Sequence, residues 1–398
     1  MKIALLIHEL VAEGGTERQC VSLARGLAEQ GHEVALYTCA YDRERCYREI
    51  GEVLDVRVTG RGWFPRLRKP EFLRRYLDMR KLASNIREGY DVWNPHHWPP
   101  HWAALEARRR FGGAVVWMCN DVPDMYEKAQ KNGGPPRTAL RRYWHRLLYR
   151  YDRSKVRKLD LVAMLDQKGR NRFSATYALP AEVVRSGVDW QKFDTRSQGD
   201  EIRLRYGFAA DAFLILCLGI LLPHRRLEDA IAAVARLRGR NLNTKLLIAG
   251  SPASSRGYFA DLQKLVRDLQ LEAAVVFAGG FPENELKQFY DACDVFLFAN
   301  DEQTWGLAVV EAMACGKPVI VSTGAGVHEV LEDGKTALLV PPRSPETIAT
   351  RIELLMRDPA LRHRLAETGR TFVREHFSWS RYAQDMAALF NKAMASRS

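Results

Sequence analysis

The residues best placed for chemistry lie in the stretch DEQTWGLAVVEAMACGKPV, which combines a predicted helix start with an internal carboxylate. Gly306 precedes apolar residues at helical spacing, among them Leu307 and Val310, and Gly316 stands where a glycine ends a helix. The unpaired N–H groups and the dipole at a helix N-terminus attract anions. We therefore expect a phosphate to bind against the backbone at Trp305, Gly306 and Leu307.

Glu311 lies within this predicted helix and follows Val309 and Val310 on its apolar side. A carboxylate in apolar surroundings requires a hydroxyl or cationic partner. A ribose diol supplies two hydroxyls, so we predict that Glu311 binds the ribose of a nucleotide. The alternative is an ordinary amphipathic helix that carries one charge.

A second anion-binding site is predicted in CLGILLPHRRLEDAI, where a strand ends at Gly219 and a helix begins near Leu227. Arg225 and Arg226 fall at the first turn of that helix, where a positive charge opposes the helix dipole. A bound diphosphate would remove this conflict. Two ordinary surface arginines are the alternative.

In the first half of the chain, Gly14 and Gly15 lie between a predicted strand and helix, where glycines let a ligand approach the backbone closely. The pattern differs from G-x-G-x-x-G, so the dinucleotide fingerprint of an oxidoreductase is absent. His96, His97 and Trp98 follow the predicted strand of YDVWN. No carboxylate-bearing spacing accompanies these histidines, so we predict no metal site and favour a platform of imidazole and aromatic groups for a sugar.

The elements that position these residues alternate between short apolar runs and helical-period segments, from KIALLIH and TERQCVSLARGLAEQ to FLILCLG and LEDAIAAVARLRG. This alternation predicts an α/β fold, with parallel sheets covered by helices on both faces. The pattern weakens at residues 186–201 and restarts at Phe213. We expect two domains facing a cleft, at residues 1–188 and 189–376, and a helix at residues 377–398 that packs back on the first domain.

Composition supports this reading, because 398 residues are too many for one ordinary core and 46% hydrophobic with 27% charged residues is typical of a globular protein. The opening apolar run, Ile3 to Ile7, stops at His8 and Glu9 and is too short for a signal peptide. No uncharged apolar stretch approaches the roughly 18 residues of a membrane-spanning helix. Seven cysteines without a C-x-x-C pair favour buried core positions in a reducing cytoplasm.

The formal net charge of +12 is compatible with nucleic acid, an anionic membrane surface or phosphorylated ligands. Much of this charge lies in two segments that interleave basic with aromatic or aliphatic residues. Residues 61–82 carry eight basic and two acidic residues, and residues 137–158 carry nine basic residues with Asp152 as the single acid. Each segment is either a solvated helix face or a surface that rests on anionic lipid head groups.

Together these motifs resemble glycosyltransferase family 4, retaining enzymes of the GT-B fold with two Rossmann-like domains, and the resemblance covers almost the whole chain. Its most specific part is EQTWGLAVVEAMACGKPVIVSTGAGVHEVLEDGKTALLVPP, which looks like the family's donor signature. AEGGTERQCVSLARGLAEQGHEVALYT resembles the family's glycine loop and first helix, and GILLPHRRLED resembles its phosphate loop. The early stretch from GGTERQC to YTCAYDRERCYREI is also similar to mannosyltransferases that extend lipid-linked oligosaccharides. This similarity implies a nucleotide-mannose donor, GDP-mannose being favoured, a lipid-linked or other saccharide acceptor and no metal cofactor.

The chain departs from the family pattern at several positions. The first of two glutamates that usually stand eight positions apart is Gln303, with Glu302 beside it, and the second is Glu311. Gln303 can hydrogen-bond the hydroxyls of a sugar, but it carries no charge. Ile220 replaces the arginine that usually follows the phosphate-loop glycine, and Arg225 replaces the usual lysine.

The resemblance also implies a division of roles among the site residues. Catalytic roles at the leaving group or the donor sugar fall to Arg225, Arg226, Gln303 and Glu311. Donor contacts are expected from Gly14, Gly15, Gly219, Gly250, Phe281, Glu302, Thr304, Trp305, Gly306 and Leu307. Acceptor contacts are expected from His96, His97, Trp98, Asn120 and Asp121, where Asn120 takes the place of a histidine common in the family.

We expect front-face attack, in which a departing phosphate oxygen accepts the acceptor's proton and the anomeric configuration is retained. A nucleotide-sugar epimerase of the same architecture is the enzyme alternative, and Asp121 would be its acid/base candidate. A basic nucleic-acid-binding protein is the alternative from another class, and it would have no donor pocket. The expected location is the cytoplasmic face of a membrane, as a peripheral protein.

Overall fold

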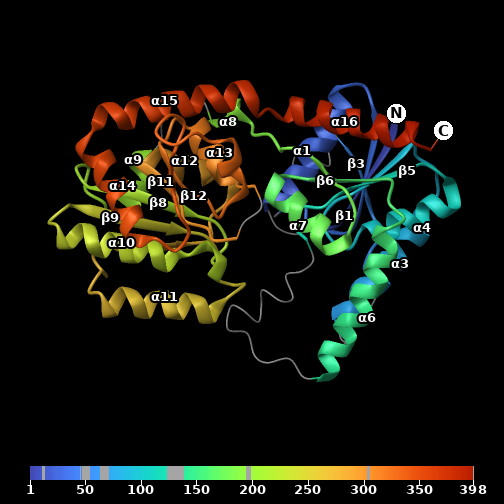
Figure 1. Cartoon of the computed structure of the whole chain (residues 1–398), viewed down its shortest axis with the longest axis horizontal. Coiled ribbons are helices and arrows are strands. Elements are labelled where there is room, and N and C mark those ends of the chain that lie inside the picture. The colour runs from blue at the N-terminus through green and yellow to red at the C-terminus, as the bar shows by residue number, and fades with distance from the viewer. Residues whose placement is uncertain are drawn as a thin grey trace. The chain divides into compact units, whose positions relative to one another are not determined.

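The computed structural model describes residues 1–10, 14–44, 46, 54–62, 71–122, 139–193, 199–302 and 305–397. For residues 71, 72 and 139–145 only the backbone is described. Contacts divide the chain into two compact units (Figure 1). Unit 1 comprises Met1–Gly187 with Trp379–Ser398, and unit 2 comprises Val188–Ser378.

Unit 1 is built on a parallel sheet whose strands follow the order β3-β2-β1-β4-β5-β6-β7 in the described residues. The strands are β1 (Lys2–Leu10), β2 (Glu33–Tyr41), β3 (Asp55–Val58), β4 (Val92–Pro95), β5 (Ala114–Met118), β6 (Leu161–Met164) and β7 (Glu182–Val183). The helices are α1 (Gly15–Glu29), α3 (Glu71–Asn85), α4 (His101–Phe111), α6 (Ala139–Val156), α7 (Gln167–Tyr177) and α16 (Trp379–Ala395). Helices α1 and α16 cover one face of the sheet, and α3 and α4 cover the other (Figure 1).

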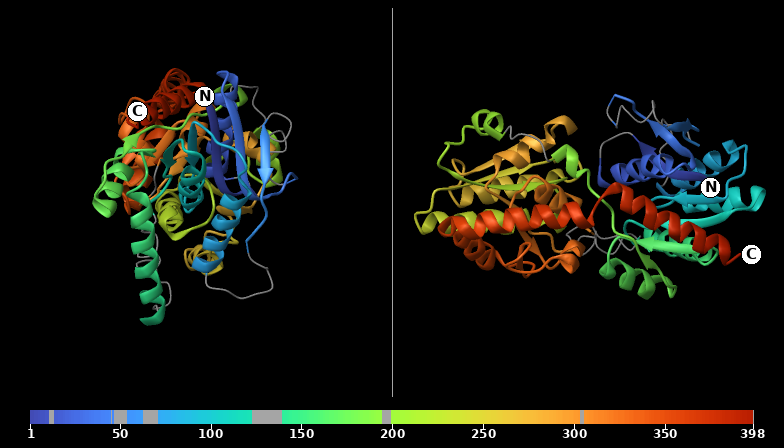
Figure 2. Two further views of the ribbon diagram at one scale, coloured as in Figure 1. Left: turned by 90° about the vertical axis from the view of Figure 1, so that its right-hand side faces the viewer. Right: turned by 90° about the horizontal axis from the view of Figure 1, so that it is seen from above.

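The sequence of β1 explains its central position in this sheet. Ile3 to Ile7 are all buried, as expected for a parallel strand that is covered by helices on both faces. On the covering layer, a Cβ on Gly26 of α1 would lie 2.8 Å from Cβ of Ala383 in α16. Glycine at position 26 therefore allows the last helix to pack closely against the first (Figure 2).

Unit 2 repeats the architecture with a parallel sheet in the order β10-β9-β8-β11-β12-β13. The strands are β8 (Phe213–Leu218), β9 (Thr244–Ala249), β10 (Val275–Gly279), β11 (Val295–Phe298), β12 (Val319–Ser322) and β13 (Leu338–Val340). The α-helices are α8 (Trp190–Phe193), α9 (Gly199–Arg205), α10 (Leu227–Gly239), α11 (Arg256–Asp268), α12 (Leu286–Ala292), α13 (Leu307–Ala314), α14 (Pro345–Arg357) and α15 (Pro359–His376). Three short 3₁₀ helices complete the described part of the unit: η1 (Pro223–Arg225), η2 (Glu283–Glu285) and η3 (Gly326–Val330).

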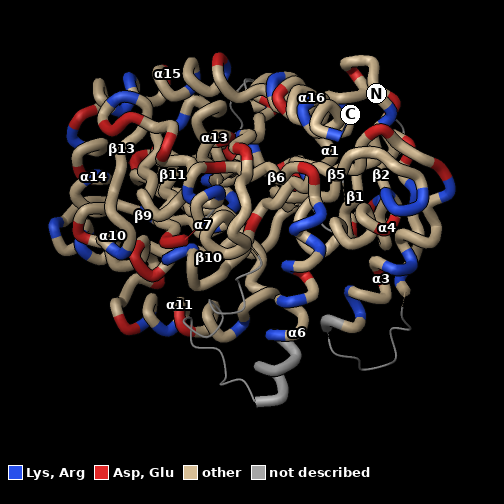
Figure 3. The backbone as a smooth tube through the Cα atoms, turned by 45° about the vertical axis from the view of Figure 1, so that its right-hand side comes forward, with Lys and Arg blue, Asp and Glu red and all other residues tan. Residues whose placement is uncertain are grey.

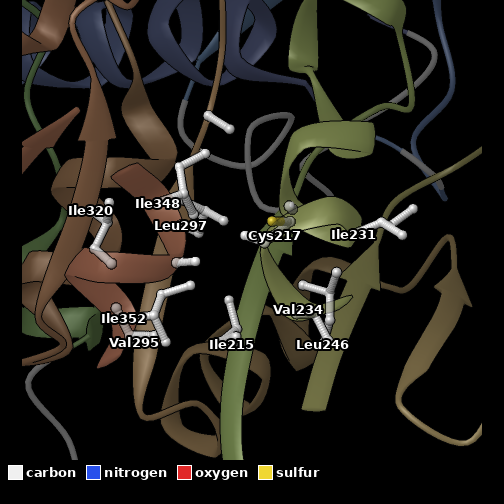
Figure 4. Packing of buried hydrophobic residues seen from close by; sticks show 14 of the residues in the cluster. Ile215, Cys217, Ile231, Val234, Leu246, Val295, Leu297, Ile320, Ile348 and Ile352 are labelled. Atoms are coloured by element: carbon white, nitrogen blue, oxygen red, sulfur yellow. The ribbon is translucent and has the colours of Figure 1, made fainter. Parts of the chain in front are cut away.

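The core of unit 2 is aliphatic. Figure 4 shows Ile215 and Cys217 of β8 and Leu297 of β11 packed with Ile231 of α10 and Ile348 of α14. All seven cysteines of the chain are free, and six of them are buried. The predicted α/β fold with two parallel-sheet domains is confirmed.

Candidate active site

Three loops of unit 2 converge where β8, β9 and β10 end. The Gly219 N–H donates to the Ala249 carbonyl at 2.9 Å, and the Gly250 N–H donates to the Gly279 carbonyl at 2.7 Å. Gly250 has a φ of 152°, and a Cβ there would collide with the carbonyl oxygen of Gly219. These glycines are therefore required for the backbones to meet at the carboxyl edge of the sheet, which is where ligands bind in open α/β sheets.

Arg225 projects from η1 into this edge. Its guanidinium carbon lies 5.8 Å from the centre of the Phe298 ring, and its Nε is buried without a hydrogen-bond partner in the described part of the chain. Burial lowers the pKa of Arg225 to about 10, so the side chain remains a cation at neutral pH. A half-buried cation whose described neighbours include no carboxylate partner is suited to bind an anionic ligand.

Arg226 has a different environment. Its guanidinium donates to both carboxylate oxygens of Asp229, at 3.0 and 2.9 Å, and lies 2.6 Å from Glu228. Both acids belong to the first turn of α10, so the chain itself neutralises this arginine. The predicted conflict between basic side chains and the helix dipole therefore applies to Arg225 alone.

Gly306 is the N-cap of α13, which starts at the next residue, and its conformation explains why the residue is a glycine. Its φ is 156°, and a Cβ would lie 2.9 Å from Cγ1 of Val327 and 3.2 Å from Cε1 of Phe298. The Phe298 ring therefore contacts both the Arg225 guanidinium and the N-terminus of α13. The two predicted anion-binding elements lie next to one another within unit 2.

Glu311 is 3% exposed on α13, and it has a partner that the sequence did not suggest. The Tyr290 hydroxyl donates to Oε2 of Glu311 at 2.8 Å. Tyr290 is fully buried and packs edge-on against Phe193 and Phe296. The partner predicted for the carboxylate was a ribose diol, whereas the structure shows a protein hydroxyl that fixes its orientation.

Asn300 is another residue that sequence reasoning missed. It follows β11, is 2% exposed, and its Nδ2 has no hydrogen-bond partner among the described residues. With Gly219, Arg225 and Phe298 it lines a cavity of about 10 Å³, which is room for one water molecule. The cavity belongs to the edge already described, and Asn300 adds a buried amide without a described partner beside Arg225.

The remaining predicted donor residues of unit 2 either lie outside the described residues, are exposed, or pack against other aromatic rings. Gln303 and Thr304 lie outside the described residues, and Glu302 is exposed. Trp305 is 2% exposed and packs against Phe377, with ring centres 5.4 Å apart. Phe281 is half-buried and packs against Phe289, 4.4 Å between ring centres, so one face of its ring is already covered.

In unit 1, the predicted glycine loop carries a negative charge of its own. Gly14 is the N-cap of α1, and Gly15 is exposed. The Glu17 carboxylate folds back over Gly14, where a Cβ would collide with it. Burial raises the pKa of Glu17. A donor phosphate at this loop would have to displace that carboxylate or find it protonated.

The predicted platform after β4 is more buried than expected, and Asp152 of α6 organises it. Asp152 is 2% exposed and accepts hydrogen bonds from Trp98, Trp102, His101 and Tyr177, at 2.8 to 3.0 Å. The single acid of the basic segment 137–158 therefore fastens α6 to the loop after β4. Trp98 is 6% exposed as a consequence.

His96 and His97 occupy the same loop. His96 is fully buried and contacts Asn94 at 2.8 Å, whereas His97 is half-buried. Burial lowers the pKa of His96 to about 3 and that of His97 to about 4, so both imidazoles are neutral at pH 7. Of the predicted platform, His97 keeps the most solvent-accessible surface, and its acceptor role stays a prediction.

Asn120 and Asp121 follow β5. Asn120 is 7% exposed and donates from Nδ2 to Oε1 of Gln19 in α1, so it holds this helix against the sheet. Asp121 is half-buried. Neither residue is a histidine, and the contact of Asn120 and Asp121 with an acceptor stays a prediction.

The two basic segments are described in part. Residues 63–70 and 137–138 lie outside the described residues, and α6 begins at Ala139. Beyond residue 145, α6 exposes Arg146, Arg150, Leu147 and Tyr149, and Arg157, one residue beyond the end of the helix, is also exposed. Figure 3 shows the basic residues of this segment in blue. Within the described part of the chain, every helix is too short or too polar to span a membrane.

Comparison with protein families gives two matches that together cover most of the chain. Residues 13–192 match the model described as Glycosyltransferase Family 4, and residues 199–372 match the model described as Glycosyl transferases group 1. The second match contains Gly219, Arg225, Gly306 and Glu311.

Individual proteins give the same picture. A D-inositol 3-phosphate glycosyltransferase of Thermomonospora curvata is 27% identical over 371 residues, which are 89% of this chain and 85% of that protein. A GDP-mannose-dependent alpha-(1-6)-phosphatidylinositol monomannoside mannosyltransferase of Mycolicibacterium smegmatis is 29% identical over 245 residues, 58% of this chain and 62% of that protein. The structure of HepE from Anabaena in complex with UDP and glucose superposes with a TM-score of 0.78 at 18% identity and covers 98% of this chain and 99% of that one.

Proposed function

Because this chain belongs to glycosyltransferase family 4 and has the GT-B fold, we propose that it transfers a hexose, with mannose favoured, from a nucleoside-diphosphate sugar to a saccharide or lipid-linked saccharide. The observation that supports this proposal is that Arg225 and the N-terminus of α13, two elements suited to bind an anion, both lie against Phe298. The Arg225 guanidinium lies 5.8 Å from the centre of this ring, and Gly306, the N-cap of α13, lies so close to the same ring that a Cβ would be 3.2 Å from it.

We propose that the nucleoside-diphosphate part of the donor binds to unit 2. The diphosphate would lie between Arg225 and the α13 N-terminus, which supply a charge and N–H groups where negative charge grows on the leaving group. Glu311, held by Tyr290, would accept hydrogen bonds from the ribose. The base would lie in the loops after Gly250 and Gly280, and Gln303 or Glu302 would contact the sugar.

Transfer is proposed to retain the anomeric configuration. The chemistry would rest on electrostatic stabilisation of the leaving diphosphate, whose oxygen takes the proton of the acceptor hydroxyl, and no metal ion is assigned a step. Arg226, which Glu228 and Asp229 already neutralise, would shape the loop rather than carry charge to the donor.

The identity of the donor rests on similarity. The mannosyltransferase of Mycolicibacterium smegmatis is named for GDP-mannose, and HepE was crystallised with UDP and glucose. GDP-mannose is our first choice because the early stretch of the sequence also resembles mannosyltransferases. UDP-glucose is the matched comparison.

The acceptor is proposed to bind unit 1, near the loop after β4, and to be delivered from an anionic membrane surface. The exposed arginines of α6 stand beside Leu147 and Tyr149, each 39% exposed, a combination that suits the boundary between lipid head groups and acyl chains. A peripheral position on the cytoplasmic face of the membrane follows from this proposal.

The test is a product assay with GDP-mannose and UDP-glucose, with and without a panel of saccharide and lipid-linked acceptors. The proposal expects release of nucleoside diphosphate that depends on acceptor, and an NMR spectrum of the product with the donor's anomeric configuration. Conversion of the donor into another nucleotide sugar without acceptor would instead identify an epimerase. An inverted product would reject the mechanism and leave the transfer intact.

A further inference from the structure

Unit 1 contains a histidine and a carboxylate that none of the proposed roles uses. His8 lies near the carboxyl end of β1, and its Nε2 is 3.1 Å from Oδ2 of Asp78 on α3. Asp78 is 2% exposed, and its other oxygen, Oδ1, accepts the Gly62 N–H at 2.6 Å. Both carboxylate oxygens are therefore engaged, and the carboxylate cannot turn away from the imidazole.

This geometry determines the tautomer of His8, that is, which nitrogen of the neutral ring carries the proton. An ionised carboxylate only accepts hydrogen bonds, so the Nε2 of His8 must carry the proton that it donates to Asp78. The other ring nitrogen, Nδ1, then has a bare lone pair. Nδ1 makes no hydrogen bond within the described part of the chain, and the His8 side chain is 21% exposed.

The position of His8 in the sheet gives the lone pair a context. In the parallel pairing of β1 with β4, Leu6 lies opposite Pro95, and the His96 N–H donates to the Leu6 carbonyl at 2.8 Å. His8 stands two residues beyond Leu6 in β1, and His97 stands two residues beyond Pro95, in the loop that follows β4. His8 thus shares the carboxyl edge of the sheet with the half-buried residue of the loop proposed to bind the acceptor.

We propose that His8, oriented by Asp78, accepts a hydrogen bond at Nδ1 from a hydroxyl of the acceptor saccharide, and that Asp78 is a positioning residue. This inference rests on the proposed glycosyl transfer. A side chain that offers one fixed acceptor atom distinguishes a hydroxyl from a group that cannot donate, and it orients the acceptor without taking its proton.

The same atoms could be read as a metal site, because Glu9 lies 3.9 Å from Nε2 of His8 and the three side chains cluster. The existing partners of the two carboxylates argue against a metal site. Glu9 is 3.2 Å from the Arg61 guanidinium, and Asp78 is held by a backbone N–H, so both carboxylates already have donors. A divalent cation would have to displace these partners.

Two substitutions separate the roles of the dyad. His8→Gln can keep an N–H at the position of Nε2 for Asp78 but places no acceptor atom at the position of Nδ1. Asp78→Asn keeps an oxygen for the Gly62 N–H and turns its NH₂ toward His8. The imidazole must then accept at Nε2 and carry its proton on Nδ1, which removes the lone pair without removing the histidine.

The experiment measures acceptor kinetics, donor kinetics and nucleoside-diphosphate affinity in both variants and in His32→Gln. His32 precedes β2 at the opposite end of the sheet and serves as the matched control. Both dyad variants should lower kcat/KM for the acceptor about tenfold or more, while KM for the donor and the affinity for the diphosphate stay unchanged. The control should match the wild type.

Three outcomes would overturn the inference. Acceptor kinetics in His8→Gln or Asp78→Asn equal to those of the wild type would show that the lone pair has no role. Transfer that is lost with EDTA and restored by a divalent cation would assign these side chains to a metal. A wild type that binds no nucleotide sugar would overturn the proposed function together with this inference. The titration with nucleoside diphosphate detects that outcome independently of the acceptor kinetics.

Discussion

Tyr290 and Glu311 are joined by a 2.8 Å hydrogen bond in which the tyrosine hydroxyl donates to the carboxylate, and both side chains are buried. The bond orients the one acidic side chain of α13 from the neighbouring helix α12. A preoriented carboxylate binds hydroxyls at a lower entropic cost than a mobile one. Tyr290 therefore belongs to the proposed donor site as a positioning residue, because it acts on the donor by orienting Glu311.

We expect Tyr290→Phe to weaken nucleoside-diphosphate binding by about 0.5–1.5 kcal/mol, because the carboxylate loses the bond that orients it. Calorimetric titration measures this affinity, and urea unfolding measures the accompanying loss of stability. Tyr177→Phe is the matched control in unit 1, where Tyr177 donates to Asp152 at 2.8 Å. Equal diphosphate affinities in Tyr290→Phe and the wild type would leave Tyr290 with a structural role only.

The two adjacent arginines should respond differently to substitution. Arg225→Met removes a cation without a described carboxylate partner, so we expect turnover to fall for every donor alike, by about 1.5–3 kcal/mol in transition-state stabilisation, without lower thermal stability. Arg226→Met leaves Asp229, which is 5% exposed, without its bidentate partner and should lower thermal stability. Steady-state kinetics and thermal unfolding of both variants provide the comparison. A change of donor preference in Arg225→Met at normal turnover would refute the leaving-group role.

Two histidines of the loop after β4, one buried and one half-buried, predict how stability depends on pH. Burial lowers the pKa of His96 to about 3 and that of His97 to about 4, from an ordinary value of 6.5. Between these values the unfolded chain binds more protons than the folded chain, so the free energy of unfolding falls as pH decreases below 6.5. The loss between pH 7 and pH 5 is about 2 kcal/mol for each such histidine.

Urea unfolding at pH 7 and pH 5 measures this slope, in the wild type and in His96→Gln. The variant should lose stability at pH 7 but show a smaller difference between the two pH values. His363→Gln replaces an exposed histidine and is the control. A pH dependence of the same size in His96→Gln and the wild type would show that His96 is not held neutral.

Membrane docking predicts a dependence on charge and salt. Replacing Arg146, Arg150 and Arg157 by Gln should weaken co-sedimentation with anionic vesicles by about 1 kcal/mol per residue, and high salt should weaken it further. Substituting Gln for Arg256, Lys264 and Arg267, three exposed cations of α11, removes the same charge from unit 2 as a control. Equal binding of the wild type to neutral and anionic vesicles would return α6 to the role of a solvated helix.

Much of the fold was predictable because its signals are local. The strands of unit 2 are short apolar runs, and all of them except β12 are followed by an α-helix, so the alternation alone predicts a parallel sheet. Gly306 and Glu311 were also identifiable, since a helix start and an apolar helix face are visible within a few residues. The positions of Gly219 and Gly250 at strand ends were predictable for the same reason, because each glycine directly follows a short apolar run.

The partners of these residues were not predictable, because they come from distant parts of the sequence. Asp152 holds Trp98, which is 54 positions away, and His8 meets Asp78 across 70 positions. Arg226 differs, because its partners Glu228 and Asp229 lie only two and three positions away, but the sequence alone does not show that these carboxylates turn toward Arg226. Burial of Trp98 likewise depends on how α6 packs, because Asp152 of this helix accepts its N–H, and no local sequence pattern indicates that contact.

Binding of a nucleoside-diphosphate donor to unit 2 through Glu311 can be measured by thermal unfolding with a panel of nucleoside diphosphates and their sugars. A ligand at about 100 times its Kd should stabilise the folded wild type by about 2.7 kcal/mol. We predict that at least one diphosphate, GDP being the first choice, produces this shift in the wild type and that Glu311→Ala loses it. A panel that leaves the wild type unchanged, or a Glu311→Ala variant that keeps the full shift, would show that Glu311 does not bind a nucleoside-diphosphate donor.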